Sequence, residues 1–181
     1  MSEVLARKLK RAFDHLDANG DGLVARSDLD ALGTRLLEEL GEAPSSAKAQ
    51  RFAERMEVFW QELAAGFDAD RDGQITMEEF RVGMTAAFVT RSDGYARIFR
   101  PAIEALIAMM DVDGDGVLSS AEFARLQRAF GTSEHDIALA FEQLDTDQDG
   151  RLSAAELDAA IEDFYTGSDA GGRGAWLFGP M

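Results

Sequence analysis

Four short segments of the chain carry acidic side chains at the same spacing. They are DANGDGLVARSD from Asp17, DADRDGQITMEE from Asp68, DVDGDGVLSSAE from Asp111 and DTDQDGRLSAAE from Asp145. In each segment the first, third and fifth residues have a side-chain oxygen, the sixth is Gly and the twelfth is Asp or Glu. A hard cation such as Ca²⁺ takes about six to eight oxygen ligands, so a loop with alternate inward-pointing carboxylates suits it. The segments therefore predict metal binding.

These segments match the calcium loop of the EF-hand, in which side-chain oxygens stand at positions 1, 3 and 5, a backbone carbonyl at 7 and a bidentate carboxylate at 12. One such segment could be a solvated turn, but four in register exclude that interpretation. The loops span residues 17–28, 68–79, 111–122 and 145–156. The expected ligands are Asp17, Asn19, Asp21, Leu23, Asp28, Asp68, Asp70, Asp72, Gln74, Glu79, Asp111, Asp113, Asp115, Val117, Glu122, Asp145, Asp147, Asp149, Arg151 and Glu156, of which Leu23, Gln74, Val117 and Arg151 offer backbone carbonyls.

Position 8 of each loop predicts how the loops pair. It holds Val24, Ile75, Leu118 and Leu152, apolar or β-preferring residues that suit a short antiparallel link. We expect Val24 opposite Ile75 and Leu118 opposite Leu152.

The first loop departs from the pattern at two positions. Position 12 is Asp28, which is one methylene shorter than Glu, and position 9 is Ala25, which has no oxygen. The shorter carboxylate reaches an ion less easily as a bidentate ligand and favours the smaller, octahedral Mg²⁺. We expect up to four Ca²⁺ in the chain, with Mg²⁺ most favoured at the loop that begins at Asp17.

The elements around the loops are expected to be helices, because apolar residues recur at helical spacing on both sides of each loop. Thr76, Ser119 and Ser153 each stand three residues before a Glu, which predicts a capping box at the start of the following helix. The expected fold is all-α, a compact globule of four EF-hands in two pairs with short antiparallel links between paired loops.

A boundary between the two pairs is expected at Ser92-Asp93-Gly94, because the nearby Pro101 disfavours a continuous helix. The expected units are an N-terminal pair over residues 1–91, a C-terminal pair over 92–165 and a tail over 166–181.

The tail has a glycine-rich lead followed by Trp176, Leu177 and Phe178. A frayed terminus is one interpretation of such a segment. Burial of the three large side chains favours a tail that docks on the core.

The acidic composition disfavours negatively charged partners. The chain of 181 residues has 34 Asp and Glu against 18 Lys and Arg, a formal net charge of -16, which repels nucleic acid and anionic membranes. Cysteine is absent, so disulfides and thiolate sites are excluded. The beginning, Met1-Ser2-Glu3, does not resemble a secretion signal. We expect a cytoplasmic monomer whose partners are calcium ions.

The uneven spacing of the loops, Asp28 and the ending Ala175-Trp176-Leu177-Phe178-Gly179-Pro180 resemble the sarcoplasmic calcium-binding protein family, in particular its bacterial, calerythrin-like members. The resemblance spans the whole chain. It implies a calcium buffer or transporter without enzymatic activity.

Two alternatives to a buffer stay open at this point. A sensor would open a helix pair on binding calcium and expose a groove for a target protein. A metal-dependent hydrolase would need an open coordination position and a substrate pocket, which loops that surround their ion with protein oxygens do not favour.

Overall fold

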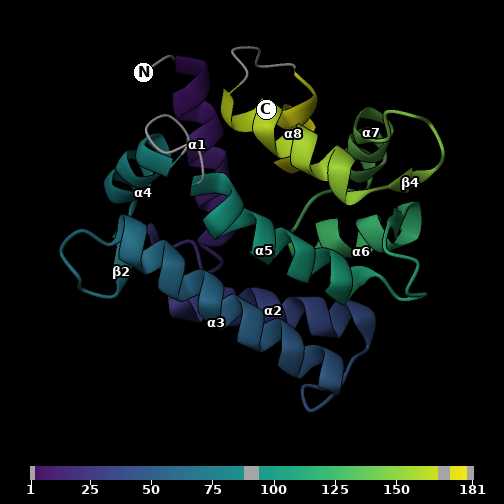
Figure 1. The fold of residues 1–181 in the computed structure, drawn as a ribbon, viewed down its shortest axis with the longest axis horizontal. Coiled ribbons are helices and arrows are strands. Elements are labelled where there is room, and N and C mark those ends of the chain that lie inside the picture. The colour runs from purple at the N-terminus through teal and green to yellow at the C-terminus, as the bar shows by residue number, and fades with distance from the viewer. Residues whose placement is uncertain (1–2, 88–93, 167–171, 179–181) are drawn as a thin grey trace.

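The computed structural model describes residues 3–87, 94–166 and 172–178. Its regular elements follow the order predicted for four helix–loop–helix units. In chain order they are α1 (Glu3–Leu16), β1 (Leu23–Ala25), α2 (Arg26–Leu40), α3 (Ala47–Phe67), β2 (Gln74–Thr76), α4 (Met77–Thr85), α5 (Gly94–Met110), β3 (Leu118–Ser119), α6 (Ser120–Ala129), α7 (Glu134–Leu144), β4 (Arg151–Leu152), α8 (Ala154–Thr166) and the 3₁₀ helix η2 (Arg173–Phe178). The all-α prediction is confirmed (Figure 1).

Local sequence signals determine where several helices begin. Thr76 and Ser119 cap α4 and α6 as predicted, each accepting a hydrogen bond from the backbone N–H of the Glu three residues later. Ser153 accepts the corresponding bond from Glu156, at 3.3 Å. Capping satisfies backbone donors that have no partner inside a helix, so these three loops lead directly into a stable first turn.

The expectation that Pro101 disfavours a continuous helix is wrong, because α5 runs from Gly94 to Met110 with Pro101 inside it. Ser92 and Asp93 of the expected boundary lie outside the described residues. A proline in a helix removes one backbone hydrogen bond and costs about 3 kcal/mol. Around it, however, Ile98, Phe99 and Ala102 are buried, and α5 packs along α3 (Figure 1). Burying a large apolar side chain contributes about 1.5–3 kcal/mol, so tertiary packing offsets the lost bond.

Two antiparallel strand pairs join the loops. Strand β1 pairs with β2, with Val24 opposite Ile75, and β3 pairs with β4, with Leu118 opposite Leu152. The predicted register is confirmed. All four position-8 side chains are fully buried, so each link also fastens its loops to the core.

The buried apolar residues form one cluster that runs through both halves of the chain. Helix α2 packs on α6, α3 on α5 and α1 on α8, so the first two hands contact the last two. The cluster includes the fully buried Leu36, Phe80, Phe123 and Phe164.

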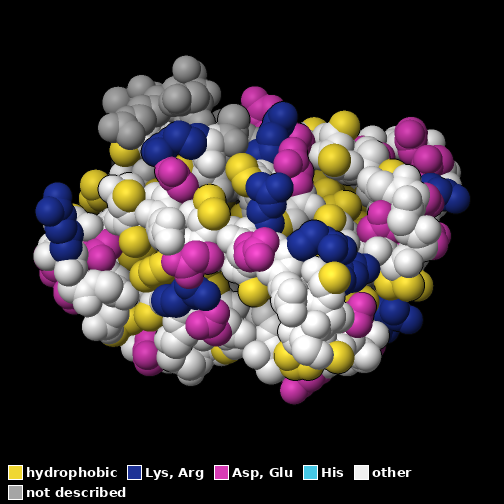
Figure 2. Space-filling model, turned by 60° about the horizontal axis from the view of Figure 1, so that its bottom comes forward, with side chains coloured by type: hydrophobic (Ala, Val, Ile, Leu, Met, Phe, Trp, Pro, Cys, Tyr) yellow, Lys and Arg dark blue, Asp and Glu magenta, His cyan; other side chains and the backbone are white. Residues whose placement is uncertain are grey.

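The surface is mixed in charge. Figure 2 shows Asp and Glu side chains interspersed with Lys and Arg, and apolar side chains between them, on the face drawn. Among the described residues, no helix combines the length and the apolar character needed to cross a membrane.

Candidate metal centres

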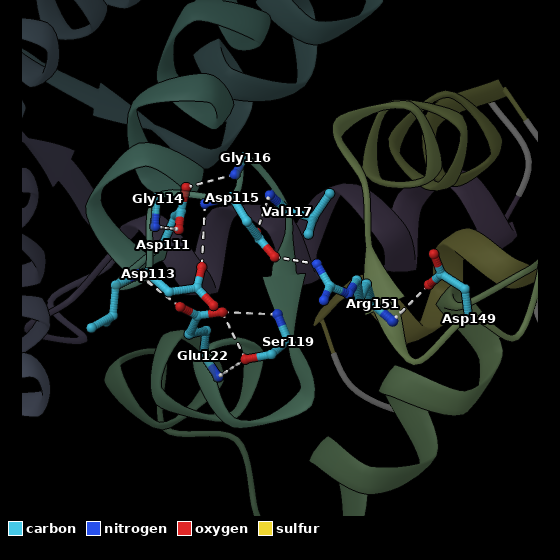
Figure 3. A network of polar contacts seen from close by, with 11 residues as sticks. Asp111, Asp113, Gly114, Asp115, Gly116, Val117, Ser119, Glu122, Asp149 and Arg151 are labelled. Atoms are coloured by element: carbon cyan, nitrogen blue, oxygen red, sulfur yellow. Dashed lines mark hydrogen bonds and ion pairs between the residues drawn. The ribbon is translucent and has the colours of Figure 1, made fainter.

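The glutamate at position 12 is fixed in the same way in three loops. In the third loop, Glu122 Oε1 accepts the backbone N–H of Val112 at 2.7 Å, while Oε2 accepts the N–H of Ser119 at 2.9 Å and its hydroxyl at 2.7 Å (Figure 3). The same carboxylate therefore closes the loop and starts the next helix.

The second and fourth loops repeat this arrangement. Glu79 accepts the backbone N–H groups of Ala69, at 3.0 Å, and Thr76, at 2.9 Å. Glu156 accepts those of Thr146, at 2.8 Å, and Ser153, at 2.9 Å. Hydrogen bonds from positions 2 and 9 of the loop therefore hold each glutamate in place within the protein.

Hydrogen bonding also keeps these glutamates ionised. The backbone N–H and the hydroxyl of Thr76 lower the pKa of Glu79 below its ordinary value. For Glu122 and Glu156, burial raises the pKa, but the hydrogen bonds that each carboxylate accepts outweigh burial, so both pKa values are lowered. Cation binding requires the ionised carboxylate, so the environment favours the binding form.

The aspartate at position 1 accepts backbone N–H groups from the turn of its own loop. Asp111 accepts those of Gly114, at 2.7 Å, and Gly116, at 2.9 Å (Figure 3). Asp17, Asp68 and Asp145 accept the N–H of the glycine at position 6 in the same way. That glycine has a φ of +81° to +85° in all four loops, a conformation that side chains disfavour.

The side chains at positions 3 and 5 extend this network along each loop. Asp113 accepts the N–H of Asp115 at 3.2 Å, and Asp115 accepts the N–H of Val117 at 3.1 Å. Equivalent bonds are accepted by Asn19, Asp21, Asp70, Asp72, Asp147 and Asp149. Of the position-7 residues, Leu23, Gln74 and Arg151 begin strands, and Val117 directly precedes one.

Three loops bring carboxylates together closely enough to share an ion. In each, one oxygen from each of three residues lies within 4.8 Å of the others, in the groups Asp68, Asp70 and Asp72; Asp111, Asp113 and Glu122; and Asp145, Asp147 and Glu156. These groups leave out Glu79, Asp115 and Asp149. The donors are all hard oxygens, which is the ligand set that calcium prefers.

Within the described residues, the loop that begins at Asp17 contributes no such group. Asp28 is only 1% exposed; its Oδ1 accepts the N–H of Ala18 at 3.1 Å and its Oδ2 that of Ala25 at 2.9 Å. The shorter side chain therefore accepts the same kind of backbone hydrogen bonds that Glu accepts in the other loops. Position 3 of this loop is Asn19, so the loop lacks the position-3 carboxylate that belongs to each of the three groups.

One contact between loops was not predicted. Arg151 was expected to offer only its backbone carbonyl, yet its guanidinium forms an ion pair with Asp115 of the neighbouring loop (Figure 3). The signal for it is the register, because Arg151 lies opposite Ser119, at the edge of the loop that contains Asp115.

Four oxygen-lined loops, two strand links and four helix–loop–helix units define the class of this protein. The pattern of the EF-hand domain pair matches residues 6–85 and 56–128, and the pattern of a single EF hand matches residues 137–160. The chain belongs to the EF-hand family of calcium-binding proteins.

Individual EF-hand proteins resemble this chain over most of its length. The chain is 30% identical to calerythrin from Saccharopolyspora erythraea over 165 residues, which cover 91% of this chain and 93% of calerythrin. It is 29% identical to the sarcoplasmic calcium-binding protein of Scylla paramamosain, covering 91% and 89% of the two chains. The solved structure of a Streptomyces coelicolor calcium-binding protein superimposes with a TM-score of 0.79 at 34% identity, over 90% of this chain and 98% of that one. Calerythrin and the sarcoplasmic calcium-binding proteins are therefore homologues, as the resemblance implied.

Proposed function

We propose that this chain is a calcium buffer, a monomeric cytoplasmic protein without catalytic activity that takes up to four Ca²⁺ in its EF-hand loops. The proposed ligands are the oxygens at positions 1, 3, 5, 7 and 12 of each loop. Mg²⁺ competes best at the loop that begins at Asp17. The N-terminal hands (1–91), the C-terminal hands (92–165) and the tail (166–181) are the proposed functional units.

The position of η2 is the observation that supports a buffer function over a sensor function. This short helix packs against α8, α7 and α1, which are elements of the first and last hands. Ala175 is buried and Trp176 packs against the core. A tail in this place covers apolar helix surface that a sensor would offer to a target.

The contact between η2 and α8 is too close for any side chain. A Cβ added to Gly174 would lie 2.3 Å from both the carbonyl oxygen of Ala160 and the backbone nitrogen of Phe164. The N–H of Gly174 donates to Asp163 Oδ2 at 2.8 Å. These contacts support a tail that stays in place when calcium binds.

The N-terminal helix reaches the same region. Lys8 of α1 is fully buried, its Nζ lies 5.6 Å from the centroid of the Phe164 ring, and it donates to the backbone oxygen of Asp163 at 3.4 Å. Opening the last hand would therefore disturb α1, α8 and η2 together, and that coupling supports a protein that changes shape little on binding.

A hydrophobic dye distinguishes the two functions. Dye fluorescence is compared in calcium and in chelator, for the full chain and for a chain lacking residues 175–181. A buffer gives low fluorescence in both conditions for the full chain and an increase in calcium only after truncation. A strong calcium-dependent increase in the full chain would reject the buffer proposal.

The second candidate is a calcium sensor, because the Streptomyces coelicolor relative is described as acting in prokaryotic calcium-mediated regulation. Under that function, calcium would expose a groove for a target protein. The dye experiment on the full chain tests this candidate directly.

A further inference from the structure

Arg151 places a positive charge on a proposed ligand of the neighbouring loop. Its Nη1 pairs with Oδ2 of Asp115, the fifth residue of loop 111–122, while Oδ1 of Asp115 accepts the N–H of Val117 at 3.1 Å (Figure 3). Both oxygens of this carboxylate therefore have partners within the protein.

The contact is a consequence of the strand link. Arg151 begins β4 and lies opposite Ser119 of β3, so its side chain reaches across the pair to loop 111–122. The position-7 residues of the other loops, Leu23, Gln74 and Val117, carry no charge. The position-5 carboxylate of loop 111–122, Asp115, is therefore paired with an arginine of loop 145–156.

We propose that Arg151 is an affinity-setting residue that lowers the calcium affinity of loop 111–122. The proposal rests on the ligand role proposed above for Asp115. An arriving divalent ion is repelled by the guanidinium, and it must compete with that guanidinium for the negative charge of Asp115. Affinity in such loops depends on the charge of the ligands, so partial neutralisation of one ligand weakens the site.

The ion pair acts on binding more than on folding. The side chains of Arg151 and Asp115 are 54% and 31% exposed, and exposed ion pairs contribute little to stability. Loss of the pair should therefore change the affinity of loop 111–122 while leaving the calcium-free fold intact. The residue makes the two C-terminal sites unequal.

The test measures loop 111–122 with its partner loop disabled. In a Glu156→Gln background, calcium binding at loop 111–122 is followed by NMR through the amide of Gly116, with Arg151 unchanged and with Arg151→Gln. A site-resolved signal is needed because loops 17–28 and 68–79 are also proposed to bind calcium. Removing the charge should strengthen binding at loop 111–122 by about three- to tenfold, less at high salt. Arg151→Lys, which keeps the charge, should recover most of the weaker affinity.

A matched control separates this contact from net charge. Arg128 also forms a surface ion pair, with Glu134 at 2.5 Å, near the other end of α6. Arg128→Gln removes the same charge and should leave the affinity nearly unchanged. Equal effects of the two substitutions would show that only net charge matters and would overturn the proposal.

Two further measurements locate the effect. With Asp115→Asn present, Arg151→Gln should have little additional effect, because the carboxylate on which the arginine acts is gone. In a Glu122→Gln background, which reports loop 145–156, the gain should be smaller. Calcium binding at loop 111–122 with an affinity unchanged by Arg151→Gln refutes the role of the arginine alone. No calcium binding at that loop in the Glu156→Gln parent refutes its proposed ligand set as well.

Discussion

At the scale of single residues, the carboxylate at position 12 of the first loop is one methylene shorter than in the other three loops. Asp28 makes the hydrogen bonds that Glu79, Glu122 and Glu156 make elsewhere, but from a shorter and almost fully buried side chain. Its loop is also the one, among the described parts of the chain, without three converging carboxylates. Our expectation that this loop favours a smaller ion rests on the shorter reach of the Asp28 side chain.

Asp28→Glu should therefore strengthen calcium binding at this loop by roughly tenfold, equivalent to about 1.4 kcal/mol. It should also weaken competition by magnesium, because a longer carboxylate can ligate the larger ion through both oxygens. Calorimetric titration with calcium, with and without magnesium, measures both effects.

Asp30→Glu is the control for Asp28→Glu. Asp30 is exposed on α2, outside the loop, where it pairs with Arg26 at 3.1 Å. If Asp28→Glu leaves calcium affinity and magnesium competition as they were, position 12 does not set the preference of this loop.

At the scale of elements, the strand links define which sites influence each other. Leu118 and Leu152 are opposite and fully buried, so movement of one C-terminal loop is transmitted to the other. The N-terminal loops have their own link through Val24 and Ile75. Coupling should therefore be stronger within a pair than between pairs.

Glu122→Gln should disable loop 111–122 and weaken calcium binding at loop 145–156 more than at loops 17–28 and 68–79. The substitution removes the bidentate charge, and the paired loop shares the β3–β4 link. Site-resolved titration by NMR follows each loop through the amide of its position-6 glycine. Equal weakening of all the remaining sites, or no change in any of them, is incompatible with the pairing.

The packing of η2 on α8 gives a second prediction at this scale. Gly174→Ala places a Cβ into the backbone of α8 and should lower thermal stability by about 1–3 kcal/mol, the usual cost of overpacking. For a chain of this size each kcal/mol shifts the midpoint of unfolding by about 2–4 °C. Scanning calorimetry in calcium measures the shift.

Gly66→Ala is the matched control, because Gly66 lies inside α3 and a Cβ there would meet Ile98 Cδ1 at 3.8 Å, an ordinary van der Waals contact. Replacing a glycine within a helix should stabilise by about 0.5–1 kcal/mol. An unfolding midpoint for Gly174→Ala at or above that of the unchanged chain would mean that η2 does not hold to α8.

At the scale of the whole molecule, negative charge dominates the calcium-free state. The formal net charge is -16, and fifteen Asp and Glu side chains stand at the proposed ligand positions of the four loops. Four Ca²⁺ ions would neutralise half of that net charge and relieve the repulsion between the carboxylates.

The midpoint of thermal unfolding should therefore rise steeply with calcium. Each independent site that binds only the folded chain contributes about 2.7 kcal/mol when calcium is in hundredfold excess over the dissociation constant. Unfolding scans in calcium and in chelator, at constant ionic strength, measure the difference. Equal midpoints would contradict ligand binding by the folded loops.

Several features could be predicted from the sequence because they depend on residues close together in the chain. The acidic spacing, the glycine at position 6 and the caps at Thr76 and Ser119 each involve contacts within one loop or one helical turn. The link between Val24 and Ile75 was also predictable, since loops of the same pattern pair through the same position. The shorter reach of Asp28 is a property of the side chain itself.

Other features depended on the tertiary structure. Helix α5 continues through Pro101 because burial against α3 outweighs one lost hydrogen bond, and local propensity cannot reveal that balance. The pairing of Arg151 with Asp115 joins residues thirty-six positions apart and requires the strand link to bring them together. The absence of a side chain at Gly174 matters only because η2 meets the backbone of α8. Such contacts depend on which surfaces the folded chain brings together. The sequence alone therefore determined the calcium loops, whereas the tertiary structure determined the ion pair between two of them and the packing of η2 on α8.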